Sequence, residues 1–396
     1  MSFSVLAPLA RIFAGFHIGV LFALTLITLL TQARAESSTG PEAEFIERAL
    51  HPFWREDLQR ESLFFIQPDS ADQPGAALLF RPTEIISIEN ATRDTAFDPD
   101  TDYEFDKATN SFRLPAGSKI PYRTVDQMYP LMTSDAPKYR RLQGDTTRGV
   151  FFDNESGYHQ LQVEVLYRCN PGQWKGPTPD YAGNILRNTL KKLKNKQPIQ
   201  LELCGDSISA GYNASKFTKT SPGCPAYGEL VALALAKHFG SSVEFTNLAV
   251  NGWNSSQGLE FLENNPAQGE NADLVIIAFG MNDVLNQDAK AFKNNIQGIM
   301  DIYRTRTSDV EFILVSTMLG NVEWGMPMEQ FSLYREALRE LTGEGVVLVD
   351  ITAFWEELLK HKSFYDLTGN GLNHPNDYGH LIYAQAVLSL LVDSRD

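Results

Sequence analysis

The sequence predicts an α/β domain with a parallel sheet, preceded by a β-rich accessory domain. Two segments of different sequence pattern along the 396 residues lead to this prediction. Residues from about 40 to 180 are rich in turn residues and short alternating runs, whereas strands and helices alternate after Gln197. The length agrees, because domains usually contain roughly 100–200 residues.

Residues 1–35 have the features of a signal peptide. Arg11 precedes the apolar run Ile12–Leu30, and Ala33 and Ala35 supply the small residues of a cleavage site. Cleavage would remove two arginines and no acidic residue, which changes the formal charge from −15 to −17. We therefore expect a secreted or periplasmic protein. An uncleaved membrane anchor is the alternative, because the run is long for a signal.

The accessory domain is expected over residues 36–180. Short strands are predicted at Ile85–Ile88 and Ser111–Leu114, and a period of two predicts a half-buried strand over His159–Val165. Turn dipeptides separate these runs, which favours a small sandwich. A basic amphipathic stretch at 182–196 predicts a solvated linker helix within 181–197.

The α/β domain is expected over residues 198–396. Alternating strands and helices predict a parallel sheet covered on both faces, with any reactive site at the carboxyl ends of the strands. The predicted strands are Ile199–Cys204, Val243–Val250, Leu274–Phe279, Phe312–Val315 and Val346–Val349, and the helices are Ala226–His238, 289–305, 328–341 and 377–392.

Composition excludes several classes of protein. The pI near 5.0 argues against nucleic acid as a partner, because an acidic surface repels phosphate. Three cysteines are too few for a disulfide scaffold or a four-cysteine metal site. Cys204 and Cys224 flank one loop, and the sequence leaves open whether they form a disulfide or remain free thiols.

Four short segments each follow a predicted strand or precede the last helix. They contain Ser207 in Cys-Gly-Asp-Ser-Ile-Ser, Gly252 in Asn-Gly-Trp, Asn282 in Gly-Met-Asn-Asp and His374 in Asn-His-Pro-Asn. In this order the set resembles the SGNH (GDSL-type) hydrolase family over about residues 199–396. The resemblance implies a three-layer, flavodoxin-like α/β/α fold and ester hydrolysis. It also implies that Ser207 is the nucleophile and His374 the general base. The oxyanion hole would be formed by the backbone N–H groups of Ser207 and Gly252 and the side-chain amide of Asn282.

One position departs from the family pattern. The family usually has Asp three residues before its histidine, and here Gly371 stands there. A literal Asp-x-x-His ends at His380, but His374 is followed by Pro375, as in the family, and is the preferred base. The group that orients His374 is left open: a backbone carbonyl near Gly371, the carboxylate of Asp366, or the amide of Asn370 or Asn373.

The resulting hypothesis is an exported serine esterase without a metal or organic cofactor, acting on O-acetyl groups of a carbohydrate. Export, the separate β-rich domain, and Trp253 and Trp324 near strand ends favour this substrate. The alternatives are a lipase or acyl-lipid esterase on the same fold, and a non-hydrolytic acyl-sugar binding protein or an acyltransferase.

Overall fold

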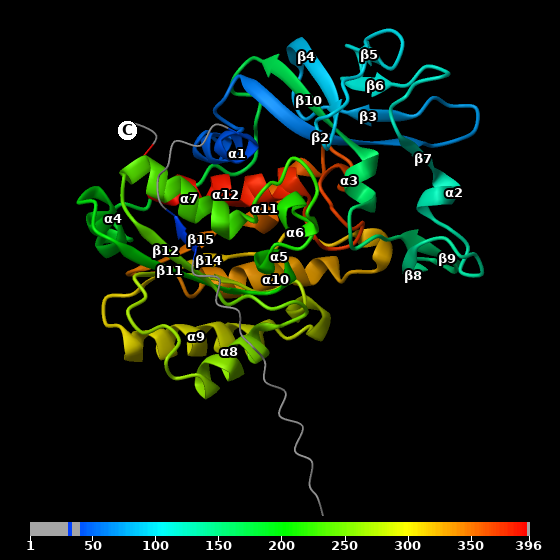
Figure 1. Cartoon of the computed structure of the whole chain (residues 1–396). Coiled ribbons are helices and arrows are strands. Elements are labelled where there is room, and N and C mark those ends of the chain that lie inside the picture. The colour runs from blue at the N-terminus through cyan, green and yellow to red at the C-terminus, as the bar shows by residue number, and fades with distance from the viewer. Residues whose placement is uncertain (1–30, 34–39, 394–396) are drawn as a thin grey trace, which may run out of the picture.

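The computed structural model describes residues 31–33 and 40–393. Nearly all of the predicted signal peptide lies outside the described residues. Two domains are stacked in layers: the β-rich sheet, a layer of helices, a parallel sheet and a second layer of helices (Figure 1). Within the described part of the chain, no helix is long and apolar enough to cross a bilayer.

The C-terminal domain contains the predicted parallel sheet. Five parallel strands are arranged in the order β12-β11-β13-β14-β15, and the short β1 (Thr31–Ala33) pairs antiparallel with β12 at the edge. Strand β13 is buried at all five positions, as expected for a sheet covered on both faces. The parallel strands are β11 (Ile199–Gly205), β12 (Val243–Asn247), β13 (Leu274–Ala278), β14 (Glu311–Val315) and β15 (Val346–Val349).

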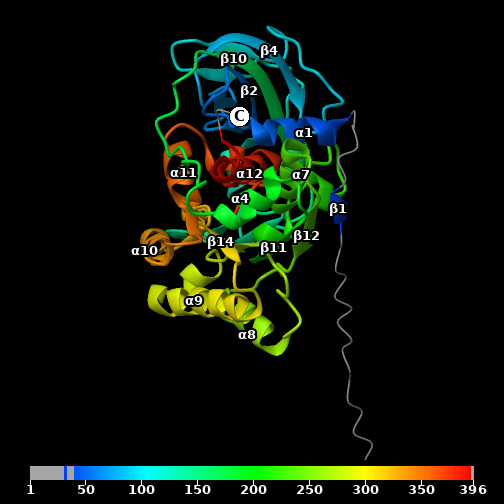
Figure 2. The same ribbon diagram turned by 90° about the vertical axis from the view of Figure 1, so that its left-hand side faces the viewer.

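Helices cover both faces of this sheet (Figures 1 and 2). Helices α7 and α12 lie between the parallel sheet and the β-rich sheet, whereas α8 and α9 lie on the opposite side. All 15 residues of α12 are buried, because the helix has neighbours on every side. The longer helices are α1 (Pro41–Leu50), α4 (Arg187–Lys194), α7 (Tyr227–Phe239), α8 (Ser255–Asn264), α9 (Ala289–Arg306), α10 (Met328–Arg339), α11 (Ile351–Leu358) and α12 (Asp377–Leu391).

Several short helices complete the fold. They are α2 (Val125–Met128), α3 (Gly157–Leu161), α5 (Ser207–Ala210), α6 (Ser215–Thr218) and the 3₁₀ turns η1 (Asp283–Asn286), η2 (Val322–Trp324) and η3 (Phe364–Asp366).

The N-terminal domain is β-rich, as predicted, but it is not a sandwich. Seven strands form one mainly antiparallel sheet in the order β4-β10-β2-β3-β6-β5, with β7 beside β2, and β8 and β9 form a separate hairpin. The apolar side chains of this sheet join the same core as those of the helices, so no second sheet is needed to cover them. The strands are β2 (Leu58–Gln67), β3 (Gly75–Ala77), β4 (Pro82–Asn90), β5 (Glu104–Asp106), β6 (Ser111–Arg113), β7 (Tyr122–Thr124), β8 (Lys138–Leu142), β9 (Asp145–Phe151) and β10 (Gln162–Cys169).

Several element boundaries differ from the prediction, among them the ends of β4, β12 and α10, and two further differences have a local cause. The strand expected from His159 begins only at Gln162, because the side chain of Asp153 accepts the backbone N–H of Gly157 and starts the helical turn α3. The linker helix expected over 182–196 is limited to α4, which follows a non-helical Leu186.

The β-rich sheet contacts the loop that precedes α12. The amide of Gln162 donates to the carbonyls of Tyr365 and Thr368, at 2.9 and 2.8 Å. A buried ion pair joins Lys362 of this loop region to Glu61 of β2. Because this loop contains His374, the two domains share the surroundings of the predicted base.

Candidate active site

Ser207 follows the first strand of the parallel sheet. Strand β11 lies where the strand order reverses, which is the usual position of a site in an open α/β sheet. The carboxylate of Asp206 accepts the backbone N–H of Ile208 and caps α5, so Ser207 becomes the first residue of a helical turn. Burial raises the pKa of Asp206 to about 7, and the nearby Asp283 also raises it.

His374 contacts Ser207 directly. Its Nε2 lies 2.9 Å from Ser207 Oγ, and both residues are buried. Burial lowers the pKa of His374 to about 3, so the imidazole is neutral and able to accept a proton. A serine with a neutral imidazole at this distance is the arrangement that activates a hydroxyl as a nucleophile.

The side chain that orients His374 is Asn213. Its Oδ1 lies 2.7 Å from Nδ1 of His374, on the side of the ring opposite Ser207. The sequence analysis missed this residue, which lies six positions after the serine and belongs to none of the four motifs. Asn213 has a φ of 64°, and asparagine is among the few residues that adopt this left-handed conformation readily. That preference is weak evidence in a sequence.

The groups that the sequence left open for this role make other contacts. The Gly371 carbonyl accepts the side-chain amide of Asn321 at 2.8 Å. The carboxylate of Asp366 accepts the backbone N–H groups of Phe64 and Ser363, at 2.7 and 3.0 Å, and does not orient His374. Asn370 instead shapes the loop, because its Oδ1 accepts three backbone N–H groups, including that of His374 at 3.2 Å. Its amide donates to Asn373.

The backbone conformation and the neighbours of Gly371 explain why the usual aspartate is absent at this position. Its φ of 86° is unfavourable for residues with a side chain, and a Cβ here would collide with the Tyr158 hydroxyl and lie 2.6 Å from the Phe151 carbonyl oxygen. Both of these residues belong to the β-rich domain. The accessory domain thus occupies the space that an aspartate side chain would need.

The segments expected to form the oxyanion hole converge beside Ser207. Val250 N–H donates to the carbonyl of Gly205 at 3.1 Å, which joins the Gly252 loop to the end of β11. The Asn282 amide donates to the Trp253 carbonyl at 2.8 Å, and its second N–H can serve a substrate. Gly252 has a φ of 78°, which glycine adopts without strain.

His380 and the cysteines lie outside the reacting groups. His380 is fully buried in α12, its Nε2 lies 3.3 Å from the Tyr212 carbonyl oxygen, and burial lowers its pKa to about 4. Cys204 and Cys224 are free thiols, so the disulfide left open by the sequence is not formed. Burial raises the pKa of the Cys204 thiol to about 12, which makes it inert as a nucleophile.

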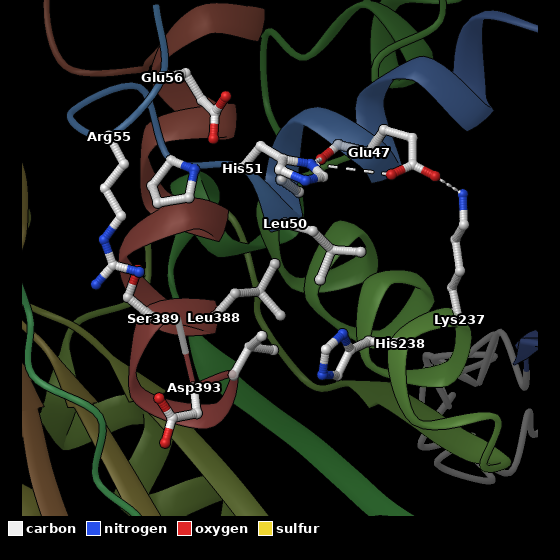
Figure 3. Close-up of a pocket in the computed structure, with 13 residues that line it drawn as sticks. Glu47, Leu50, His51, Arg55, Glu56, Lys237, His238, Leu388, Ser389 and Asp393 are labelled. Carbon is white, nitrogen blue, oxygen red and sulfur yellow. Dashed lines mark hydrogen bonds and ion pairs between the residues drawn. The ribbon is translucent and has the colours of Figure 1, made fainter. Parts of the chain in front are cut away.

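A separate pocket lies at the far end of α12 from His374. Figure 3 shows this cavity of about 420 Å³ between α1, α7 and α12, where Glu47 lies between His51 and Lys237. Its lining includes Leu388 and Asp393, whereas His374 precedes the first turn of the helix. Because a helix of 15 residues is about 22 Å long, this pocket does not belong to the serine site.

The fold and the buried Ser207–His374 contact define the class of an α/β serine hydrolase. Residues 203–382 match the GDSL-like lipase/acylhydrolase family, a family of ester hydrolases. This confirms the resemblance found in the sequence. No curated protein matches the chain.

Solved structures with a similar fold match at low identity. The lipase Lip_vut3 from a goat rumen metagenome is 16% identical, with a TM-score of 0.40 over 48% of this chain and 97% of that one. A two-domain esterase active on acetylated mannans is 20% identical, with a TM-score of 0.42 over 55% of each chain. An acetyl-xylooligosaccharide esterase from Geobacillus is also 20% identical, with a TM-score of 0.40 over 49% and 94%.

Proposed function

We propose that this protein is an exported esterase that removes O-acetyl groups from a carbohydrate through an acyl-enzyme on Ser207. The observation that carries the serine mechanism is the 2.9 Å contact between Ser207 Oγ and His374 Nε2. The neutral imidazole accepts the hydroxyl proton while Oγ attacks the acetyl carbonyl. The first product is then the sugar alcohol, which leaves with the proton held on His374 Nε2.

Water completes the cycle. His374 takes a proton from water, the resulting hydroxide attacks the acetyl group on Ser207, and acetate is released with the serine restored. Each tetrahedral intermediate carries an oxyanion, which the backbone N–H groups of Ser207 and Gly252 and the amide of Asn282 are placed to stabilise. No step requires a metal or an organic cofactor.

An aromatic cluster favours a sugar as the leaving group. Tyr139 of β8 has its ring centroid 5.1 Å from that of Phe152 and 5.7 Å from that of Trp324, and 39% of Tyr139 is exposed. Aromatic faces offer flat apolar surfaces for the C–H groups of a sugar ring. Trp253, the other tryptophan considered, packs on Phe261 instead.

This cluster borders the loop of the catalytic histidine. Trp324 ends η2, and Asn321 just before η2 binds that loop through two bonds: its N–H donates to the Leu372 carbonyl and its amide to the Gly371 carbonyl, both at 2.8 Å. A sugar ring on the cluster would therefore lie on the rim of the serine site. Both domains contribute to this surface.

One observation favours an acyl-lipid substrate as a second candidate. Phe217 is 45% exposed and contacts Tyr212, whose ring centroid lies 5.4 Å from that of His374. An acyl chain would find an apolar surface there.

A panel of esters separates the two candidates. The proposal expects the highest kcat/KM with acetylated oligosaccharides and a fall as the acyl chain lengthens. Tyr139→Ala or Trp324→Ala should raise KM for acetylated oligosaccharides about tenfold and leave p-nitrophenyl acetate hydrolysis unchanged. Tyr122→Ala, at an exposed tyrosine outside the cluster, is the matched control. Activity that rises with chain length would instead support the lipid substrate.

Export is tested separately. N-terminal sequencing of the protein recovered outside the cytoplasm should begin at Glu36 if the predicted signal is cleaved after Ala35.

A further inference from the structure

We infer that a backbone carbonyl of the β-rich domain, that of Glu155, selects the catalytic tautomer of His374 through Asn213. The Asn213 amide Nδ2 donates to the Glu155 carbonyl oxygen at 3.2 Å, and its Oδ1 faces His374 Nδ1 at 2.7 Å. The amide thus connects one domain to the catalytic histidine of the other. This inference rests on the proposed serine mechanism.

The side-chain amide of Asn213 determines which ring nitrogen of His374 carries the proton. An amide oxygen only accepts, so with Oδ1 toward His374 the proton of the neutral ring must reside on Nδ1. Nε2 is then unprotonated and accepts the proton of Ser207. If the amide turned over, its NH₂ would face Nδ1, the ring proton would move to Nε2, and the base would be blocked.

The Glu155 carbonyl prevents this turn. Asn213 can satisfy that carbonyl only with Nδ2, because a carbonyl oxygen cannot donate. Turning the amide over would place Oδ1 of Asn213 against the Glu155 carbonyl oxygen, where neither atom can donate. It would also turn the NH₂ group of Asn213 toward His374. Asn213 is buried, so a group that lost its partner would not be compensated by bulk water.

A short turn holds the carbonyl in place. The Asp153 carboxylate accepts the backbone N–H groups of Glu155 and Gly157, both at 2.9 Å, just before α3. The buried Tyr158 then donates its hydroxyl to the Phe151 carbonyl at 2.9 Å. The Glu155 side chain itself is exposed. Asp153 is therefore a positioning residue that acts through a backbone carbonyl and Asn213.

The test removes the Asp153 bonds. Asp153→Ala should lower kcat for p-nitrophenyl acetate about three- to tenfold with an unchanged KM, the loss expected when one neutral hydrogen bond no longer fixes an orientation. Asp153→Asn keeps an acceptor and should restore most of the rate. Gln160→Ala, on the exposed side of α3, is the control that leaves the rate unchanged.

Two further readouts separate this role from a general loss of structure. Long-range ¹H–¹⁵N NMR spectra should show His374 protonated at Nδ1 in the wild type and a mixture of tautomers in Asp153→Ala. In an Asn213→Ala background, Asp153→Ala should have no further effect on kcat, because its route to the histidine is gone. If thermal melting shows that Asp153→Ala does not fold, Tyr158→Phe loosens the same segment and should shift the tautomer in the same direction.

The inference is overturned if Asp153→Ala and Tyr158→Phe leave kcat and the tautomer unchanged, or if the losses of Asp153→Ala and Asn213→Ala multiply. Ser207→Ala, assayed alongside, distinguishes a failure of the serine mechanism from a failure of the role proposed for the Glu155 carbonyl. Its full activity would reject the serine mechanism itself, whereas its inactivity together with a normal Asp153→Ala rejects only the role of the carbonyl.

Discussion

Asn213 Oδ1 lies 2.7 Å from His374 Nδ1, the position that a carboxylate takes in a Ser-His-Asp triad. The site is therefore a Ser-His-Asn arrangement, of the kind that papain-like proteases use with cysteine. An amide orients the imidazole but adds no negative charge to stabilise the imidazolium. The expected behaviour of the enzyme follows from this difference.

The reacting pair is tested first. Ser207→Ala and His374→Ala should each lower kcat by about 10⁴–10⁶-fold, because either residue alone leaves no activated nucleophile. The measurement is the rate of p-nitrophenyl acetate hydrolysis per mole of folded protein. His380→Gln is the control for the base, and it should keep most of the activity. The assignment is wrong if His380→Gln loses activity while His374→Ala retains it.

The second prediction concerns pH. A general base works only when deprotonated, and the pKa of His374 is lowered to about 3 by burial. The acid limb of kcat/KM should therefore lie well below pH 6.5. Asn213→Asp places an anion beside the ring, raises the pKa of His374 and should move that limb toward neutral pH.

Asp206 is the control for this profile. Its pKa is about 7, so a change in kcat/KM near neutral pH would be assigned to the titration of this carboxyl group. Asp206→Asn should abolish such a transition and leave the acid limb of His374 in place. An acid limb near pH 6.5 in the wild type would contradict the neutral, buried imidazole.

The third prediction restores the aspartate of the family. Gly371→Asp should reduce activity and lower Tm by several degrees, because the side chain meets Tyr158 and Phe151 at a positive φ. Gly343→Ala provides a matched control, since a Cβ there meets no atom within 4 Å. Higher activity in Gly371→Asp would show that Tyr158 and Phe151 can move aside and that the new aspartate can orient His374 as in a Ser-His-Asp triad.

The fourth prediction concerns the oxyanion. Asn282→Ala should lower kcat about 10²–10³-fold with little change in KM, as expected for a donor that acts in the transition state. Asn286→Ala, on the exposed side of the neighbouring turn, should be neutral. Steady-state kinetics with an acetyl ester measure both values. A change confined to KM would assign Asn282 to substrate binding instead.

The fifth prediction concerns stability in acid. The pKa of His380 is lowered to about 4 by burial, so the unfolded chain binds more protons than the folded one as the pH falls below 6.5. The contribution of His380 to the free energy of unfolding is fully present above pH 6.5. It decreases by about 2 kcal/mol as the pH falls from 7 to 5. His380→Gln should therefore lose less stability between pH 7 and 5 than the wild type, as measured by urea denaturation. Equal losses would show that His380 is not the group responsible.

Local patterns predicted much of the fold. Helices α9 and α12 and strand β15 lie within one residue of their predicted bounds, because their periodicity and caps are contained in the segments themselves. The sandwich and the strand from His159 were wrong for a different reason. Which face of a strand is covered, and by what, depends on packing between segments distant in the sequence.

The sequence by itself determined the α/β domain, from its alternating strands and helices, and its resemblance to the SGNH family implied the pairing of Ser207 with His374. Only the tertiary structure decided the third member. Asn213 carries no motif, and its role depends on the Glu155 carbonyl and on the space that Tyr158 takes beside Gly371. Those contacts join residues more than 50 positions apart and across two domains, so no local pattern records them.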